Sequence, residues 1–277
     1  MLPAEPRLAF RDAVALGLLH GPAELLPISS SGHTTLIPWL AGRPYAELDG
    51  AVRKSFELSL HAGTGLALAI DMRGELRAAA GELDRRRAGV LALSLLPAAL
   101  AGVSLRGQIE RRLGGPGAIA LGLAAGAIAM ALAEWRAPRP ASGGRDCSQA
   151  QAADGLALGL AQAGALMPGV SRNGATLAAA RARGFTPAAA QQLSWDVALP
   201  VILGASALEA RRLGRGGPAR EQRAAFAGGA VASFLSTLAL AGKLRRRARR
   251  SLLPYALYRC LLAALVLARL RRERGSA

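Results

Sequence analysis

Long apolar segments dominate the pattern of hydrophobic and polar positions along the chain. The segments 88–105, 113–133 and 224–242 contain no charged residue. A helix needs roughly 20 predominantly apolar residues to cross about 30 Å of hydrocarbon, whereas a helix on the surface of a soluble protein keeps a polar face over such a length. The pattern therefore predicts membrane-spanning helices. A soluble chain rich in Ala and Leu is the alternative.

Other apolar segments predict further elements, and two of these segments are broken. We expect further spans at 193–208 and 251–270, and an apolar segment at 56–71. The segment 13–28 is too short and too polar to face lipid, and 152–167 runs into a polar stretch after Pro168. Irregular backbone at membrane depth must be buried in protein or line a wet cavity. We therefore predict an all-α, polytopic membrane bundle with two re-entrant or broken helical elements.

Composition and charge agree with this prediction. Hydrophobic residues make up 52% of the chain and charged residues 19%, whereas soluble domains carry about 25% charged residues. The net charge of +17 comes almost entirely from arginine, since Lys54 and Lys243 are the only lysines. The basic residues separate apolar segments instead of forming one stripe, which favours contact with anionic headgroups over nucleic-acid binding.

The second part of the sequence restarts the pattern of the first. A polar, Pro- and Gly-containing linker at about 134–151 separates the halves 1–137 and 150–277. Aligning Gly32 with Gly174 gives an offset of 174 − 32 = 142 positions. Paired interrupted helices in two halves are typical of inverted repeats with a binding site at the midplane. We expect one integral membrane domain over 1–277, although chance similarity between two turn sequences is an alternative.

The cysteines and the N-terminus add little. Cys147 lies in a polar loop and Cys260 in an apolar span, without metal-binding spacing, so no disulfide is expected. No cleavable signal peptide is expected either, because Pro22 and Glu24 break the first apolar stretch.

The two broken elements carry the candidate chemistry. Each would present amide groups at a helix N-terminus, where the backbone and the helix dipole attract phosphate. Arg172 would add a planar cation that suits phosphate oxygens. Glu24 could accept a proton from Ser30 or orient His33, and ionisable residues within apolar segments are functional candidates.

Each of these residues also has a structural interpretation. Glu24 could be an interfacial residue, Ser29–Ser31 an N-cap, His33 a satisfied polar residue and Arg172 a snorkelling anchor. Only their occurrence together favours an active site.

Two motifs resemble a known family. The segments 24–33 (ELLPISSSGH) and 168–176 (PGVSRNGAT) are similar to the signatures of bacterial undecaprenyl-diphosphate phosphatases of the bacitracin-resistance type. Shorter runs around Phe56, Leu199 and 254–259 extend the resemblance over almost the whole chain.

The resemblance implies hydrolysis of undecaprenyl diphosphate to undecaprenyl phosphate, which recycles the lipid carrier for cell-wall synthesis. Glu24 would be a general base or a metal-linked carboxylate, Ser30 or His33 the attacking group, and Arg172 the phosphate clamp. Our preferred hypothesis is attack by Ser30 with Glu24 as base. The residues expected to line the phosphate cradle are Ser29, Ser31, Gly32, Ser171, Asn173, Gly174 and Thr176.

The chain departs from the family pattern at several positions. His20 stands where the family has a second acidic residue, His61 where Gln is common, and Asp196 at a usually apolar position. The family's Mg²⁺ or Ca²⁺ is therefore an uncertain cofactor here, with Glu24 and His20 as the candidate ligands, because imidazole is softer than carboxylate. We hypothesise that His20 and His61 face each other and that Asp196 restores negative charge. Lineage drift without compensation is the alternative.

The resemblance also implies a cellular location and binding partners, and two alternative functions remain. We expect a multi-pass protein of the bacterial inner (plasma) membrane whose partners are the polyprenyl diphosphate, the bilayer and, in a homodimer, a second copy of the chain. No nucleic acid is expected. A polyprenyl-phosphate transporter or flippase is the main alternative function, and a non-catalytic membrane scaffold is a lesser one.

Overall fold

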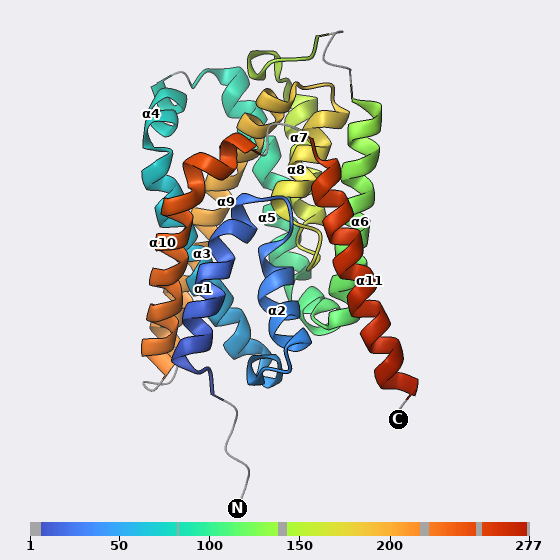
Figure 1. Cartoon of the computed structure of the whole chain (residues 1–277). Coiled ribbons are helices and arrows are strands. Elements are labelled where there is room, and N and C mark those ends of the chain that lie inside the picture. The colour runs from blue at the N-terminus through green and yellow to red at the C-terminus, as the bar shows by residue number, and fades with distance from the viewer. Residues whose placement is uncertain (1–6, 82, 138–142, 217–221, 248–250, 276–277) are drawn as a thin grey trace, which may run out of the picture.

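The computed structural model describes residues 7–81, 83–137, 143–216, 222–247 and 251–275 (Figure 1). These residues form helices joined by short turns, and no strand occurs among them. The first half contains α1 (Phe10–Leu25), α2 (Ser30–Leu40), η1 (Pro44–Glu47), α3 (Gly50–Asp71), α4 (Arg73–Gly81), α5 (Arg85–Leu113) and α6 (Pro116–Arg136). The second contains η3 (Cys147–Gln149), α7 (Ala152–Gly164), α8 (Arg172–Ala182), α9 (Pro187–Gly216), α10 (Arg223–Arg247) and α11 (Leu253–Gly275).

Four helices in the described part of the chain are long and apolar enough to cross a membrane. They are α5, α6, α10 and α11. Helices α5 and α10 contain the predicted segments 88–105 and 224–242, and α6 and α11 cover the predicted segments 113–133 and 251–270 from Pro116 and Leu253 onwards. The predicted segments 56–71 and 193–208 lie inside α3 and α9. The prediction of an all-α membrane protein is confirmed.

The linker begins later than the sequence suggested. Helix α6 continues through Arg136, so the first residues of the predicted linker 134–151 are helical. A cation in the last turn interacts favourably with the helix dipole. The helix stops just before Ala137, because Pro138 disfavours helical backbone in the residue that precedes it.

Two short helices begin at strained serines. Ser29 caps α2 with φ 79°, and its Oγ accepts a hydrogen bond from the Gly32 amide at 3.3 Å. Ser171 caps α8 with φ 67°, and its Oγ accepts from the Gly174 amide at 3.2 Å. The N-cap interpretation of Ser29 is therefore correct for that residue, and both helices start inside the broken elements.

The two helical hairpins enter the bundle from opposite ends. In Figure 1 the α1–α2 hairpin rises from the end where α11 finishes, and the α7–α8 hairpin descends from the end that carries η3. Helix α1 packs along α10, and α7 packs along α5. Gly17 and Gly159, again 142 positions apart, allow these close approaches, because a Cβ atom at either would collide with the backbone of the partner helix.

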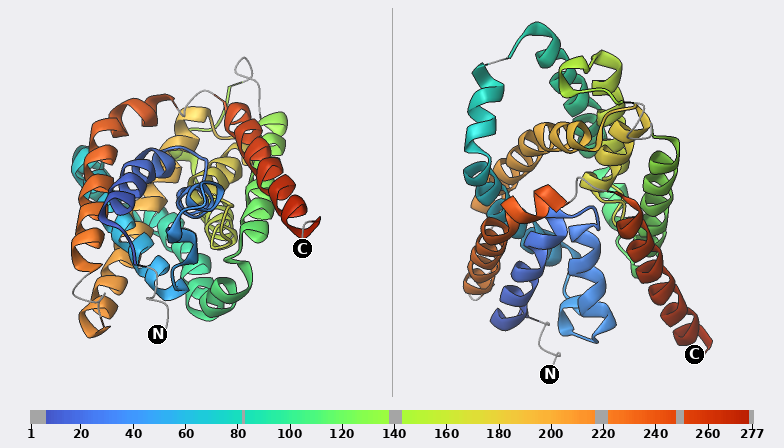
Figure 2. Two further views of the ribbon diagram at one scale, coloured as in Figure 1. Left: turned by 60° about the horizontal axis from the view of Figure 1, so that its bottom comes forward. Right: turned by 45° about the horizontal axis from the view of Figure 1, so that its top comes forward.

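The remaining helices surround the hairpins. When the lower end of the molecule is turned forward (Figure 2, left), α1 and α2 lie in the middle, with α10 on one side and α11 on the other. Helices α6 and α11 pack together, as do α3 and α9. The tips of both hairpins are thereby held inside the protein, where irregular backbone is tolerated.

Candidate active site

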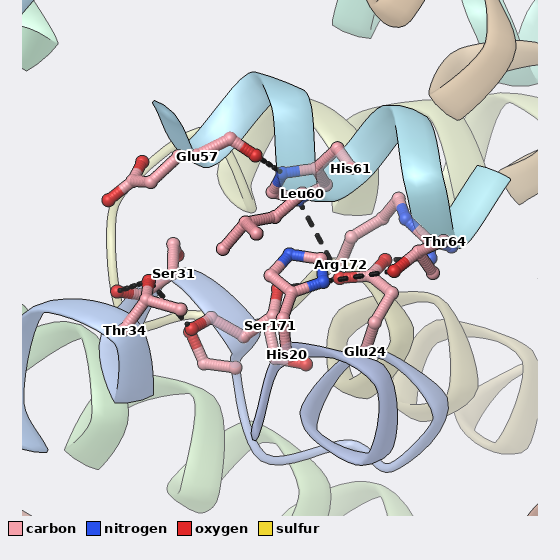
Figure 3. Close-up of polar contacts among 12 residues, drawn as sticks. His20, Glu24, Ser31, Thr34, Glu57, Leu60, His61, Thr64, Ser171 and Arg172 are labelled. Carbon is pink, nitrogen blue, oxygen red and sulfur yellow. Dashed lines mark hydrogen bonds and ion pairs between the residues drawn. The ribbon is translucent and has the colours of Figure 1, made fainter. Parts of the chain in front are cut away.

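Glu24 is the centre of a buried polar group at the meeting point of the two hairpins (Figure 3). Its Oε2 accepts a hydrogen bond from Ser30 Oγ at 2.6 Å, and its Oε1 accepts one from Arg172 Nη2 at 2.7 Å. Ser30 and Glu24 come from the first half and Arg172 from the second. The structure therefore brings together three of the four residues expected to do the chemistry.

Arg172 has one side of its guanidinium group free for a further acceptor. Its Nη2 contacts Glu24, while its buried Nη1 has no hydrogen-bond partner. The guanidinium carbon lies 5.9 Å from the centroid of the Trp195 ring. A buried donor without an acceptor is costly unless a ligand supplies one. These contacts favour an anion-binding role for Arg172 over the role of a snorkelling anchor.

Two histidines flank the carboxylate. The rings of His20 on α1 and His61 on α3 are 4.5 Å apart at an interplanar angle of 77°, so they face each other as hypothesised. His61 Nε2 lies 3.7 Å from Glu24 Oε2. One ligand atom from each of His20, Glu24 and His61 lies within 4.8 Å of the others, which makes this group able to hold a metal ion.

The donor set of this group tests the expected cofactor. Mg²⁺ and Ca²⁺ prefer oxygen ligands, but this group offers two imidazole nitrogens and one carboxylate. Imidazole suits zinc, copper, iron and nickel. The residues therefore fit Mg²⁺ or Ca²⁺ poorly, and we derive no catalytic step from either ion.

Asp196 does not lie with this group, which corrects one expectation. Asp196 accepts a hydrogen bond from Gln192 on its own helix at 2.8 Å, and the charged side chains that act on it are Arg87 and Glu75. It also lies near Cys147 in η3. Since α9 turns Asp196 towards the linker end, it cannot restore charge beside Glu24.

His33 is the fourth predicted residue, and its ring points towards α11. His33 Nδ1 donates to the Ser29 carbonyl at 2.7 Å, which leaves Nε2 to accept from the Tyr258 hydroxyl at 2.6 Å. The two rings stack with centroids 5.6 Å apart. The described contacts of His33 therefore link it to Tyr258 rather than to Glu24.

Most residues expected to line the phosphate cradle have their polar groups engaged in the fold. Asn173 donates to the Leu25 carbonyl and accepts from Ser194, and Thr176 donates within its own helix and contacts Ser194. The backbone amides of Gly32 and Gly174 are also engaged, because they donate to Ser29 Oγ and Ser171 Oγ. These contacts give a structural role to Ser29, Gly32, Ser171, Asn173, Gly174 and Thr176. Ser31 is partly exposed, so it remains the candidate for direct phosphate contact.

The chain is similar to known proteins over most of its length. The model of the bacitracin resistance protein BacA family matches residues 13–265. This chain belongs to the BacA family. It is 37% identical over 269 residues to the undecaprenyl-diphosphatase of Geobacter sulfurreducens, covering 92% of this chain and 96% of that protein. It is 35% identical over 273 residues to the undecaprenyl-diphosphatase of Thermomicrobium roseum, with the same coverage.

In this BacA family member Arg259 is a further residue of the site, which the sequence pattern does not single out. Arg259 is fully buried, and its guanidinium group donates to the carbonyls of Pro27, Gly169 and Val170 at 2.8–3.3 Å. One side chain of α11 therefore holds the turns of both hairpins. The signal in the sequence is a cation inside an apolar span, and the run 254–259 otherwise stands out only through the family resemblance.

A separate ion cluster fixes the outer end of the α7–α8 hairpin in this BacA family member. Asp154 lies in the first turn of α7, outside the four spans, and is bound by Arg145 at 2.6 Å and by Arg183 at 2.6 Å. Burial alone would raise the pKa of Asp154, but the hydrogen bonds from Arg145 and Arg183 outweigh burial and lower the pKa to about 2. The cluster ties the linker to both helices.

Proposed function

We propose that this protein hydrolyses the terminal phosphoanhydride of undecaprenyl diphosphate, which yields undecaprenyl phosphate and inorganic phosphate. The observation that carries the proposal is the buried contact of Glu24 with both Ser30 and Arg172. It combines a nucleophile, a base and a phosphate-binding cation at the tips of two membrane-embedded hairpins. The names of the BacA-family relatives, undecaprenyl-diphosphatase, supply the substrate.

Ser30 is the proposed nucleophile. Its hydroxyl proton passes to Glu24 as Oγ attacks the terminal phosphorus, and the bond from that phosphorus to the bridging oxygen breaks. The electron pair of the broken bond leaves with undecaprenyl phosphate. Water then attacks the phosphoserine, regenerates the Ser30 hydroxyl and releases phosphate. A nucleophile within hydrogen-bond reach of its base is the arrangement that such catalysis requires, and the separation of 2.6 Å between Ser30 Oγ and Glu24 Oε2 meets it.

Arg172 is the proposed clamp for the transferred phosphoryl group. Its free Nη1 provides a donor to a phosphate oxygen while Nη2 stays on Glu24. Catalysis of phosphoryl transfer depends mainly on positioning and on electrostatic stabilisation of the equatorial oxygens. Contact with both Glu24 and the substrate would align the base, the nucleophile and the phosphorus.

His33 is proposed to act through Tyr258 or, as an alternative, as the phosphoryl acceptor. The Tyr258 hydroxyl donates to His33 Nε2 at 2.6 Å, so a proton can pass between the imidazole and a leaving oxygen through the phenol. In the alternative, Nε2 must first lose its contact with Tyr258. The hydrogen bond supports the first of these roles.

The proposed cellular location and domain organisation follow from the same features. We propose a multi-pass protein of the bacterial inner membrane, organised as one domain with two pseudo-repeated halves, that binds its polyprenyl diphosphate from the bilayer. A homodimer also remains a proposal. Transport of the lipid carrier as the only function is not favoured, because the relatives' names denote a phosphatase and because a buried serine–carboxylate pair serves hydrolysis and not binding alone.

Phosphate release tests the proposal. Purified protein in detergent should release inorganic phosphate from undecaprenyl diphosphate and from a shorter polyprenyl diphosphate. Ser30→Ala should lower turnover by at least about 10²-fold, because the pathway loses its covalent step. Ser104→Ala is the matched control, since Ser104 is exposed and donates to the Leu100 carbonyl of its own helix α5. Full turnover by Ser30→Ala would refute the serine mechanism, and no release by the parent protein would refute the function.

A further inference from the structure

We propose that His20, Glu24 and His61 form a binding site for one borderline transition-metal cation, with zinc the best fit, instead of the Mg²⁺ or Ca²⁺ expected from the family resemblance. The site would lie between α1 and α3, where Figure 3 shows His20, Glu24 and His61, and Ser30 Oγ donates to the same Glu24 carboxylate. The proposal rests on the function proposed above for Glu24, but metal binding itself is measurable without turnover.

The hydrogen bonds around His20 fix where its ring carries the proton. Ser233 Oγ donates to the Leu60 carbonyl, so the 2.7 Å contact between Ser233 and Thr64 must use the Thr64 proton. Thr64 therefore has no proton left for His20, and the 3.0 Å contact requires His20 Nδ1 to be the donor. In neutral imidazole the other nitrogen is then unprotonated. His20 Nε2 consequently presents a lone pair.

His61 also carries its proton on Nδ1, and a single hydrogen bond shows this. Its Nδ1 lies 2.8 Å from the Glu57 carbonyl, which can only accept, so Nδ1 carries the proton. The Nε2 of neutral His61 then directs a lone pair at Glu24 Oε2, 3.7 Å away. Both histidines thus donate from Nδ1 to an oxygen, which is how protein partners usually orient metal-binding imidazoles.

Without a cation, this arrangement leaves acceptors facing one another. His20 is fully buried and its Nε2 has no hydrogen-bond partner. A buried polar atom without a partner destabilises the fold. A cation between His20 Nε2, His61 Nε2 and the Glu24 carboxylate would satisfy all three lone pairs, whereas a proton on His61 would satisfy only the contact with Glu24.

The donor chemistry selects the ion. Two imidazole nitrogens and one carboxylate oxygen make up the protein ligands of many catalytic zinc sites, which leave a further position open. Mg²⁺ and Ca²⁺ favour sites built from oxygen. The charges are compatible, because Arg172 already balances Glu24 and the diphosphate substrate brings the anionic charge that a divalent ion requires. The open position would face this substrate.

Metal content provides the direct test. The full-length protein would be purified through an affinity tag that contains no histidine, stripped with chelator and equilibrated with Zn²⁺, Co²⁺, Mg²⁺ or Ca²⁺ separately. We expect one Zn²⁺ per chain by elemental analysis, and visible Co²⁺ absorption of the intensity given by low-coordinate sites. We expect Mg²⁺ and Ca²⁺ to be lost on gel filtration.

Variants locate the ion. His20→Gln and His61→Gln should each abolish stoichiometric Zn²⁺ and the Co²⁺ absorption. Thr64→Val, which removes only the partner of His20, should weaken Zn²⁺ binding by about 10–100-fold. His20→Glu combined with His61→Gln should retain Mg²⁺. The matched control is Cys147→Ser combined with Cys260→Ser, which removes both free thiols of the described chain and should leave Zn²⁺ binding unchanged.

Each outcome decides the matter. Absence of Zn²⁺ from folded parent protein, equal retention of Mg²⁺, or unchanged Zn²⁺ in either His→Gln variant would overturn the proposal. Circular dichroism of every variant separates loss of the site from loss of the fold. Phosphate release is measured in parallel, so a protein that binds Zn²⁺ but releases no phosphate would refute the proposed function and leave the metal site standing.

Discussion

Ser29 and Ser171 adopt the same unusual backbone conformation 142 positions apart, with φ 79° and 67°. They are the only non-glycine residues with positive φ in the described chain. A non-glycine residue there is strained and persists only where the surrounding structure holds it. Behind them Thr34 and Thr176 each donate to the carbonyl four residues earlier. The two turns are therefore structural copies, which supports the proposal of a repeat.

The Arg259 side chain donates hydrogen bonds to both of these turns, and its loss should destabilise the fold. In Arg259→Met the carbonyls of Pro27, Gly169 and Val170 lose their donor. Each buried acceptor left without a donor costs about 1–3 kcal/mol, so we expect a loss of at least about 3 kcal/mol. The midpoint of thermal unfolding in detergent measures this loss. Arg271→Met, an exposed position on the same helix, should have little effect. Equal midpoints for the two variants would contradict this role of Arg259.

Replacing Arg172 by lysine should damage catalysis while keeping the positive charge. A lysine cannot donate to Glu24 and to a phosphate oxygen with the fixed geometry of a guanidinium group. We expect kcat/KM for phosphate release to fall by about 10²–10³-fold, as when one preorganised donor is removed from an active site. Unfolding in detergent should be nearly unchanged. If kcat/KM stays within a few-fold of the parent value, Arg172 is not the clamp.

Tyr258→Phe tests whether His33 works through the phenol. The change removes the donor to His33 Nε2 and keeps the stacked ring. We expect kcat to fall by roughly 10-fold with little change in KM, a smaller effect than the about 10²–10⁴-fold cost of losing a general acid altogether. The pH profile of kcat should also change, because His33 loses its partner.

Tyr255→Phe is the matched control for this change, since Tyr255 packs one turn earlier against a hydrophobic cluster. It should preserve both kcat and the pH profile. A rise in kcat in Tyr258→Phe would instead indicate that Tyr258 blocks an imidazole that attacks phosphorus directly.

Asp154 should make the stability of the protein depend on pH at the acidic end. Its pKa falls from an ordinary 3.8 to about 2 through Arg145, Arg183 and the Gln151 amide, against the opposing effect of burial. A carboxylate with a lowered pKa stabilises the fold fully above pH 3.8, and this contribution disappears as pH falls through about 2. In Asp154→Asn the contribution is absent at every pH.

The measurement is the unfolding midpoint of parent and variant between pH 6 and the most acidic pH that the detergent sample tolerates. We expect Asp154→Asn to be less stable than the parent at pH 6, and the difference to shrink on acidification. A difference that does not vary with pH would exclude the ionised Asp154 as its source.

Much of this protein follows from its sequence, because a bilayer imposes simple rules. The uncharged segment 113–133 had to be a span, and all of it from Pro116 onwards lies in α6. The motifs around Ser30 and Arg172 had to form buried irregular backbone, since Pro27 and Pro168 interrupt the helices. Glu24 and Arg172 were natural candidates because charges inside apolar segments are costly.

What the tertiary structure decided was which side chains meet. The sequence alone suggests Asp196 as the replacement for a lost carboxylate, but the rotation of α9 directs it towards Gln192 and away from Glu24. The partnership of His33 with Tyr258 spans 225 positions, and no local pattern encodes it. Helix packing, set by close contacts such as that at Gly17, determines which faces of distant helices oppose each other. Periodicity in the sequence defines a face but not its partner, and for that reason the convergence of His20 and His61 on Glu24 becomes evident only in the folded protein.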